Sequence, residues 1–179
     1  MILLLPFLGI ALMIKTTMPG TIFFIQQRVG KNGKLFNLIK FRTMNLASGK
    51  ERGSFDAGDT SRITPVGVFL RKYKIDELPQ LFNVLLGDMS FVGPRPEVKQ
   101  WTSVYPEKWK IVHSVMPGIT DNASIEFRNE ELILAESQDP LKTYEEIILP
   151  RKLDLYIDYV QSRSFWGDIA IILKTIKVL

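Results

Sequence analysis

The stretch KIDELPQLFNVLLGDMSFVGPRP, residues 74–96, decides how the middle of this chain folds. Pro79 lies inside it, and a proline is tolerated in a helix only within the first turn, so we expect a helix to begin near Ile75 to Leu78. The apolar side chains that follow at helical spacing then face the protein interior. This start places two neighbouring carboxylates, Asp76 and Glu77, at the N-terminus of the helix.

The acidic pair has two interpretations. Acidic residues in the first turn of a helix are common capping devices, and that interpretation needs no chemistry. The alternative is a reactive centre, because the helix dipole and the free backbone N–H groups stabilise a charged carboxylate. We therefore expect Asp76 to be ionised at neutral pH, as a carboxylate nucleophile or an Mg²⁺ ligand must be. The two residues alone do not decide between these interpretations.

Basic side chains accompany the pair in the sequence. A carboxylate that attacks a phosphoanhydride needs the negative charge of its target neutralised, and Arg, Lys or a hard divalent cation can do this. The order of the chain does not show whether these side chains converge in space. The candidates are Arg71, Lys72 and Lys74 before the pair, Arg95 between two prolines after it, and Lys40 and Arg42 at the end of a predicted strand.

The composition excludes several classes of function. The chain has 179 residues, of which 46% are hydrophobic and 23% charged, as expected for one folded domain. It has no cysteine, which excludes a disulfide scaffold, a thiol nucleophile and a cysteine metal site. The single His113 argues against a histidine metal site. The net charge of +4 suits an anionic partner, but charge alone is the only support for nucleic acid, so we predict no nucleic-acid partner.

The sequence predicts a mixed α/β fold that is rich in helices and has a small β-hairpin. β-Branched and aromatic residues flank the turn GKNG, which predicts the hairpin over residues 19–44. The polar segment 45–62 is typical of a mobile loop and is a candidate active-site lid. Thr64 and Pro65 predict the N-cap and first position of a short helix. Further helices are expected over residues 106–115, 139–163 with a break at Pro150, and 164–179.

Both ends of the sequence are apolar. Residues 1–14 carry no charged side chain but are too few to span a bilayer, which takes about 20 residues. Pro6 would break or kink a helix here, so the segment either dips into one leaflet or forms a buried core helix. The helix over residues 164–179 combines aromatics, aliphatics and lysines, a pattern that fits an interfacial helix and a core-packed helix equally well.

Four motifs become specific when they are taken together. They are FIQQRVGKNGKLFNLIKFRTM, IDELPQLFNVLLGDMSFVGPRP, MPGIT and YVQSRSFWGDIAIILKTI. In this order and at these spacings they resemble the bacterial sugar transferase family, the monotopic phosphoglycosyl transferases. The resemblance covers nearly the whole chain. It implies transfer of a sugar-1-phosphate from a UDP-sugar to polyprenyl (undecaprenyl) phosphate, which gives a polyprenyl diphosphate sugar and UMP. This reaction is the first membrane step of bacterial capsule, exopolysaccharide, O-antigen or glycoprotein assembly.

The resemblance also implies roles for individual residues. It makes Asp76 the nucleophile of a covalent phosphosugar intermediate, with Glu77 deprotonating or orienting the incoming polyprenyl phosphate. Mg²⁺ is implied at Asp76, and Asp168 matches an acidic position that is either metal-related or structural. The basic positions implied near the substrate phosphates are Arg95 and Arg71, together with Lys40 and Arg42 at the end of the hairpin.

The family fold implied by the resemblance is monotopic. A helix–break–helix enters and leaves one leaflet, on the cytoplasmic face of the bacterial inner membrane, and amphipathic helices lie along the interface. Pro6 matches the breaking proline, but only five residues precede it, so the first half-helix is expected to be missing. We therefore interpret residues 1–15 as the remnant of the re-entrant helix and residues 16–179 as the catalytic domain.

Two alternatives remain open at this stage. Without the first half-helix, the chain is either an active transferase or a catalytically inactive membrane-surface interaction module on the same scaffold. Many family members carry Gly-Trp where this chain has Asp121 and Asn122, which points to a subfamily with different sugar or nucleotide contacts. The sequence does not decide between a monomer and a homo-oligomer, nor does it name the sugar.

Overall fold

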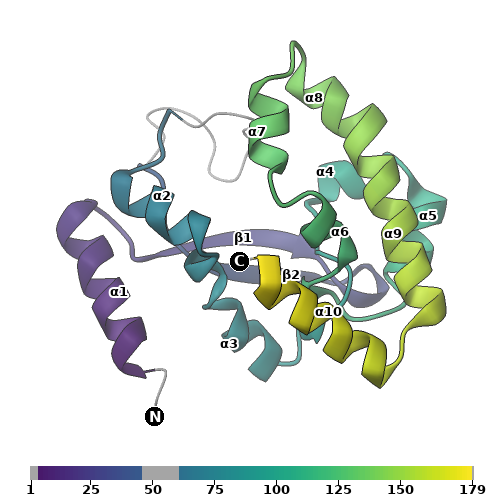
Figure 1. The fold of residues 1–179 in the computed structure, drawn as a ribbon, viewed down its shortest axis with the longest axis horizontal. Helices are drawn as coiled ribbons and strands as arrows, with labels where there is room; N and C mark the ends of the chain where they lie inside the picture. The colour runs from purple at the N-terminus through teal and green to yellow at the C-terminus, as the bar shows by residue number, and fades with distance from the viewer. Residues whose placement is uncertain (1–3, 46–60, 179) are drawn as a thin grey trace.

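The computed structural model describes residues 4–45 and 61–178. It confirms the predicted class, a helix-rich mixed α/β fold with a small antiparallel sheet. Figure 1 shows helix α1 at one edge, the hairpin of β1 and β2 across the middle, and helices α4 to α9 on the far side of the hairpin. Most of the segment 45–62, predicted to be a mobile lid, lies outside the described residues.

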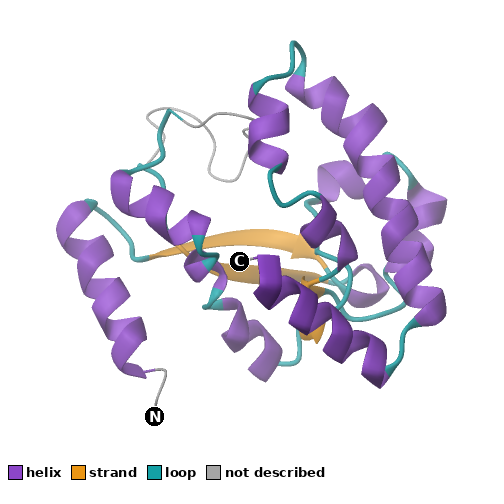
Figure 2. Cartoon of the chain, in the orientation of Figure 1, coloured by secondary structure: helices purple, strands orange, loops and turns teal. Residues whose placement is uncertain are grey.

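The predicted hairpin is confirmed. Strand β1 (Phe23–Val29) pairs antiparallel with β2 (Leu35–Phe41), and the two stand out as the long strands of Figure 2. A 3₁₀ turn over Lys31–Gly33 joins them, and its Asn32 and Gly33 have positive φ angles of 57° and 75°. The turn motif GKNG supplies a glycine where the backbone enters the left-handed region, which explains why it ends one strand and begins the next.

Helix α2 (Pro65–Lys72) begins as the sequence predicted. The Thr64 side chain accepts a hydrogen bond from the backbone N–H of Gly67 at 3.0 Å, and Pro65 occupies the first turn. Gly67 packs directly on the end of the hairpin, where an added Cβ would lie 2.0 Å from the carbonyl oxygen of Thr43. A side chain at position 67 would therefore not fit between α2 and the segment that follows β2.

The acidic pair lies in a 3₁₀ turn and not in the α-helix that follows. Residues Ile75–Glu77 form this turn, which begins after Lys74 in the left-handed conformation (φ 53°). Helix α3 (Gln80–Leu85) begins only after Pro79, which occupies the N-cap position. The predicted helix start near residues 75–78 was thus a few residues early. Pro79 is pre-organised for helix entry, but the turn before it is tighter than α.

A second, smaller sheet was not predicted. Strand β3 (Ser90–Val92) pairs parallel with β4 (Gly118–Thr120), and both strands are too short to give a visible alternation of apolar residues. The backbones around it approach very closely, since a Cβ on Gly118 would lie 2.1 Å from the backbone nitrogen of Gly93. Gly118 N–H also donates to the carbonyl of Pro94 at 3.0 Å, which fastens the start of the GPRP segment to this sheet.

The far side of the molecule is a helical lobe around the largest core cluster. Trp101, Trp109, Leu153 and Tyr156 are among its buried members. The predicted helix over residues 139–163 divides where expected, because a π-turn precedes Pro150, which cannot donate a backbone hydrogen bond. The elements are α4 (Lys99–Thr102), α5 (Pro106–Val112), α6 (Asn122–Glu126), α7 (Glu130–Ala135), α8 (Pro140–Thr143), the π-turn Tyr144–Ile148 and α9 (Leu149–Ser162).

The two apolar end segments are both helical. Helix α1 (Leu4–Thr17) has Pro6 in its first described turn and continues without a break, so the kink expected at Pro6 is not found within the described residues. One face of α1 packs into a core cluster that includes Ile14 and Phe41, while Leu5, Leu8 and Leu12 remain exposed. Helix α10 (Phe165–Val178) is confirmed and buries Ile171. No helix among the described residues is long and apolar enough to cross a bilayer.

Replacing Gly67 by alanine should destabilise the protein by about 1–3 kcal/mol, because the new Cβ would overlap the Thr43 carbonyl group. The matched control is Gly9→Ala in α1, where an added Cβ meets nothing within 4 Å. Both substitutions raise helix propensity, so the difference between them isolates the close contact. Urea unfolding followed by circular dichroism measures both variants. Equal stability of the two would contradict the approach of α2 to the hairpin.

Candidate active site

The acidic pair opens onto a large cleft of about 1540 Å³. Its walls come from β1, the end of β2, the turn before α3, the GPRP segment, α6, α7 and the C-terminal half of α10. The structure therefore brings together most of the residues that the sequence analysis singled out. Those that line the cleft are Lys40, Arg42, Arg71, Lys72, Lys74, Asp76, Glu77 and Arg95, whereas Asp168 is not among the described lining residues.

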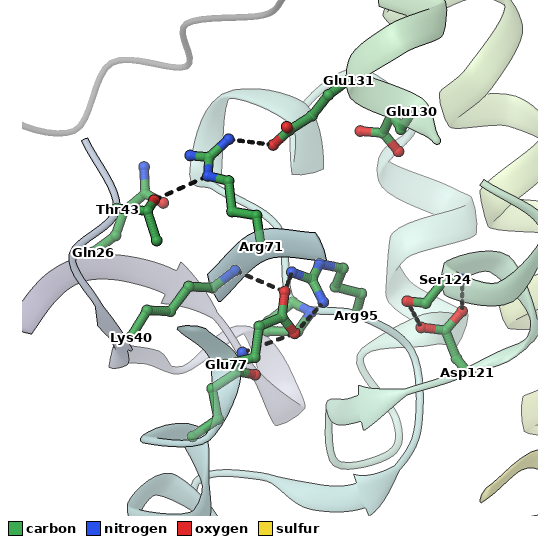
Figure 3. Close-up of polar contacts among 12 residues, drawn as sticks. Gln26, Lys40, Thr43, Arg71, Glu77, Arg95, Asp121, Ser124, Glu130 and Glu131 are labelled. Atoms are coloured by element: carbon green, nitrogen blue, oxygen red, sulfur yellow. Dashed lines mark hydrogen bonds and ion pairs between the residues drawn. The ribbon is translucent and has the colours of Figure 1, made fainter. Parts of the chain in front are cut away.

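Glu77 is the hub of the site (Figure 3). Arg95 makes a two-pronged contact with it, Nη2 to Oε1 at 2.6 Å and Nη1 to Oε2 at 3.1 Å. Lys40 Nζ donates to Oε1 at 3.1 Å, and Gln80 Nε2 donates to Oε2 at 3.1 Å. The carboxylate thus ties together the hairpin, the turn before α3 and the GPRP segment.

The charges around Glu77 shift its pKa strongly. Burial acts to raise the pKa of this carboxyl group, but Arg95 and Lys40 outweigh burial and hold the pKa well below its usual range. In turn, Glu77 raises the pKa of Arg95, while burial lowers the pKa of Lys40. Glu77 is therefore expected to stay negatively charged. This favours a role in holding the two cations in place over a role in accepting a proton.

Asp76 stands in a different environment from its neighbour. Only 8% of the residue is exposed, and among the described residues its buried Oδ1 atom has no hydrogen-bond partner. Burial raises the pKa of Asp76, Lys40 lowers it, and the charge on Glu77 raises it again. Helix N–H groups were expected to favour the charged form of Asp76, but the residue lies in the 3₁₀ turn before α3, and burial acts in the opposite direction on its pKa. That Asp76 is ionised at neutral pH stays a prediction.

Arg71 reaches the cleft from α2. Its Nε donates to Thr43 Oγ1 at 2.9 Å, and its Nη1 pairs with Glu131 of α7 at 2.6 Å. Figure 3 shows Arg71 and Glu131 facing each other above the Glu77 hub. Because Glu131 is well exposed, this pair contributes little to stability, and the guanidinium group is able to exchange its partner for an anion.

Arg42 lines the cleft but binds the backbone. Its Nη1 donates to the carbonyl of Pro19 at 2.7 Å and its Nη2 to the carbonyl of Met18 at 2.9 Å. These carbonyl groups follow α1, so the buried Arg42 fastens the end of that helix to the hairpin. The substrate contact that the resemblance implied for Arg42 stays a prediction.

Asp168 lies in the first turn of α10, away from the described cleft lining. Its carboxylate accepts a hydrogen bond from the Tyr159 hydroxyl at 3.0 Å, and burial together with this bond raises the pKa of Tyr159 to about 12. The described residues include no group of three or more His, Cys, Asp or Glu side chains placed to hold a metal ion. A metal role for Asp168 stays a prediction, and its observed contact fixes α10 to α9.

Asp121 is the N-cap of α6. Its carboxylate accepts hydrogen bonds from the backbone N–H of Ser124 at 2.9 Å and from the Ser124 hydroxyl at 2.7 Å. The residue is buried, and burial raises the pKa of its carboxyl group. Ser124 lines the cleft and Asp121 does not, so the observed link of Asp121 to the cleft is its cap on α6. A subfamily with different substrate contacts stays a prediction.

Several polar residues of this region were not predicted from the sequence. Gln80 lies three residues after Glu77, a spacing at which side chains share a helix face and which offered a signal for the contact. The buried Glu97 and its partner Arg28 also line the cleft wall, at 3.0 Å from each other. They are 69 residues apart in the sequence, so no local pattern indicates their pairing.

Comparisons with known proteins place this chain beside several sugar transferases. The N-acetylgalactosaminephosphotransferase of Aeromonas hydrophila, named for UDP-N-acetylgalactosamine and undecaprenyl phosphate, is 36% identical over 96% of this chain and 38% of its own length. The UDP-glucose:undecaprenyl-phosphate glucose-1-phosphate transferase of Xanthomonas campestris is 38% identical over 96% of this chain and 34% of its own length. The uncharacterized sugar transferase EpsL of Bacillus subtilis is 40% identical over 87% of this chain and 68% of its own length.

The chain spans about a third of the length of the first two relatives, so it corresponds to one part of those proteins. The family model described as bacterial sugar transferase matches residues 1–179. That match includes the acidic pair, the GPRP segment and the elements that bring them together. The chain therefore belongs to the bacterial sugar transferase family.

Proposed function

We propose that this protein transfers a sugar-1-phosphate from a UDP-sugar to polyprenyl (undecaprenyl) phosphate. The observation that carries the proposal is the asymmetry of the acidic pair. Asp76 has a carboxylate oxygen without a partner among the described residues, and Glu77 beside it holds two cations at the same cleft. The names of the relatives, which specify UDP-sugars and undecaprenyl phosphate, support this substrate pair.

In the first step, an Asp76 oxygen attacks the phosphorus that carries the sugar. A bond forms between that oxygen and the phosphorus, and the bond from the phosphorus to the bridging oxygen breaks. UMP leaves with the electron pair, and the sugar phosphate stays on Asp76 as an acyl phosphate. Arg95 and Lys40, already gathered at Glu77, neutralise the charge that develops on the phosphate oxygens.

In the second step, a phosphate oxygen of the polyprenyl phosphate attacks the same phosphorus. The bond between that phosphorus and Asp76 breaks, the carboxylate is released, and a polyprenyl diphosphate sugar results. The low pKa of Glu77 favours a role in orienting the acceptor through Lys40 and Arg95 over a role in removing a proton.

Mg²⁺ is the proposed cofactor, and the donor set at the site fits it. The partnerless oxygen of Asp76 is a hard ligand, and Mg²⁺ commonly takes one or two carboxylates and fills its other positions with water and substrate phosphates. This agrees with the lack of a larger carboxylate cluster among the described residues. A bound Mg²⁺ would offset negative charge on the diphosphate, and its charge would oppose the effect of burial on the pKa of Asp76.

The proposed location is the cytoplasmic face of the bacterial inner membrane, in one leaflet. Exposed apolar side chains on three helices support contact with lipid. They include Leu5, Leu8 and Leu12 on α1, Leu85 at the end of α3 with the C-cap residue Leu86, and Trp166, Leu173 and Ile176 on α10. The rings of Phe7 and Phe82 pack edge-to-face with their centroids 5.8 Å apart, so α1 and α3 are neighbours.

Asp76→Asn should lower the rate of UMP release by at least about 1000-fold, because the amide cannot form the acyl phosphate. Intact-protein mass spectrometry with UDP-sugar alone should show the added sugar phosphate on the unsubstituted chain and not on the variant. Asp88→Asn is the control, since Asp88 belongs to the same motif and does not line the cleft. Full activity of Asp76→Asn would refute the nucleophile assignment.

Lys40→Met should move the acid limb of the pH–rate profile to higher pH. The reaction needs a charged Asp76, and Lys40 lowers the pKa of that carboxyl group, so removal of the cation raises the pH at which activity is lost. UMP release measured between pH 5 and pH 9 tests the shift. Lys31→Met, on the exposed hairpin turn, should leave the limb in place. An unmoved limb in Lys40→Met would show that Lys40 does not act on Asp76.

Removal of Mg²⁺ by EDTA should reduce UMP release by at least about 100-fold, and added Mg²⁺ should restore it. Unchanged activity in EDTA would exclude the proposed cofactor.

A panel of UDP-sugars, each tested with undecaprenyl phosphate and Mg²⁺ for release of UMP, identifies the sugar. If the folded chain binds lipid vesicles yet never releases UMP or gains mass with any donor, it is the inactive surface module instead.

A further inference from the structure

The segment that carries Arg95 has no secondary structure of its own. Residues 94–98 are neither helix nor strand, so no secondary structure of the segment's own holds Arg95 in place. Pro94 and Pro96 restrict the backbone on either side of Arg95, but its position relative to Glu77 depends on contacts with the rest of the fold. Before Arg95 the contact is the hydrogen bond from Gly118 N–H to the Pro94 carbonyl, and after Arg95 the contacts gather at Glu97.

Glu97 lies in a buried cluster of charged and polar groups beside the cleft. Only 4% of the residue is exposed. Its Oε2 accepts a hydrogen bond from Arg28 Nη1 at 3.0 Å, and its Oε1 accepts one from the Tyr144 hydroxyl at 2.7 Å. Lys152 Nζ stands 4.0 Å from Oε1 and pairs with Glu130 at 2.5 Å. Both carboxylate oxygens are thus occupied by the protein itself.

The backbone of the segment is fastened to the same strand as the side chain. Val29 N–H donates to the Glu97 carbonyl at 2.9 Å, and Arg28 Nη1 also donates to the Pro96 carbonyl at 3.2 Å. Arg28 therefore holds the side chain of Glu97 and the carbonyl group of the residue that follows Arg95. Loss of the Glu97 charge would loosen both contacts at once.

Stability alone is a poor explanation for this cluster. Removing two charges from water costs several kcal/mol per ion, and apolar residues of similar volume often replace a buried ion pair without loss of stability. Direct substrate binding by Glu97 is also a poor explanation, because each of its oxygens already accepts a hydrogen bond from the protein. What the cluster does accomplish is to fix residues 95–97 against β1.

We propose that Glu97 is a positioning residue of the active site, which holds Arg95 in the orientation that meets both Glu77 and the substrate phosphates. The effect of Glu97 on catalysis rests on the proposed function, whereas its effect on the orientation of Arg95 does not. Glu97 acts through Arg28 and through the backbone of the segment, and Tyr144 fixes its second oxygen from the helical lobe. The helical lobe is thereby linked to the phosphate-binding cation.

The kinetic test is a double-mutant cycle. Glu97→Gln should lower kcat/KM for the UDP-sugar by about 10- to 100-fold, with a raised KM, as expected when a positioning group is displaced. A variant that only lost part of its folded population would show a lower kcat at an unchanged KM. Because Glu97 acts through Arg95, the double variant Glu97→Gln/Arg95→Lys should be no slower than Arg95→Lys alone. Additive effects, or an unchanged KM in Glu97→Gln, would overturn the proposal.

A second readout does not depend on turnover. In the intact chain labelled with ¹⁵N-arginine, the guanidinium signals of Arg95, assigned with Arg95→Lys, should broaden or shift in Glu97→Gln. Tyr144→Phe, which removes one hydrogen bond and no charge, should shift them in the same direction by less. Asp154→Asn, which breaks the exposed Lys108–Asp154 pair of 2.6 Å, should leave them unchanged. Unmoved Arg95 signals in Glu97→Gln would overturn the proposal whether or not the chain releases UMP.

Discussion

The charge on Glu77 is the constraint on which the rest of this structure depends. Lys40 and Arg95 come from segments 55 positions apart in the sequence, and both lie partly buried beside one carboxylate. Two partly buried cations without that carboxylate would face uncompensated desolvation and mutual repulsion. With it, the hairpin, the turn before α3 and the GPRP segment converge on one point, and two cations are held together at the wall of the cleft.

The two adjacent carboxylates, Asp76 and Glu77, have different contacts and therefore different roles. Glu77 is saturated with donors and stays charged, whereas Asp76 keeps an oxygen without a partner among the described residues. Neighbouring residues of the same charge normally repel, and here the cations placed on Glu77 reduce that repulsion. The pair is therefore neither a simple helix cap nor two equivalent acids. It combines an anion that holds the site together with one that is proposed to react.

Much of this could be predicted from the sequence because the signals were local. The hairpin turn, the Thr64–Pro65 cap and the helix after Pro79 each follow from a few adjacent residues with strong conformational preferences. The family motifs indicated which side chains belong to one site. The surroundings of Asp76 could not be predicted, because burial and the positions of Lys40 and Glu77 set its pKa, and burial depends on the packing of the whole chain. Three-residue strands and the Arg28–Glu97 pair have no local signature at all.

The two hydrogen bonds from Arg42 to the carbonyl groups after α1 have a mechanical consequence. Arg42 belongs to the same chain segment as Lys40, so hydrogen bonds join the end of the apolar helix to a segment that lines the cleft. With α1 seated in lipid, as the proposed location requires, a change in its tilt or depth would displace this segment as well. On that proposal, the height of Asp76 above the headgroups, where a polyprenyl phosphate would present its charge, depends on how α1 is inserted.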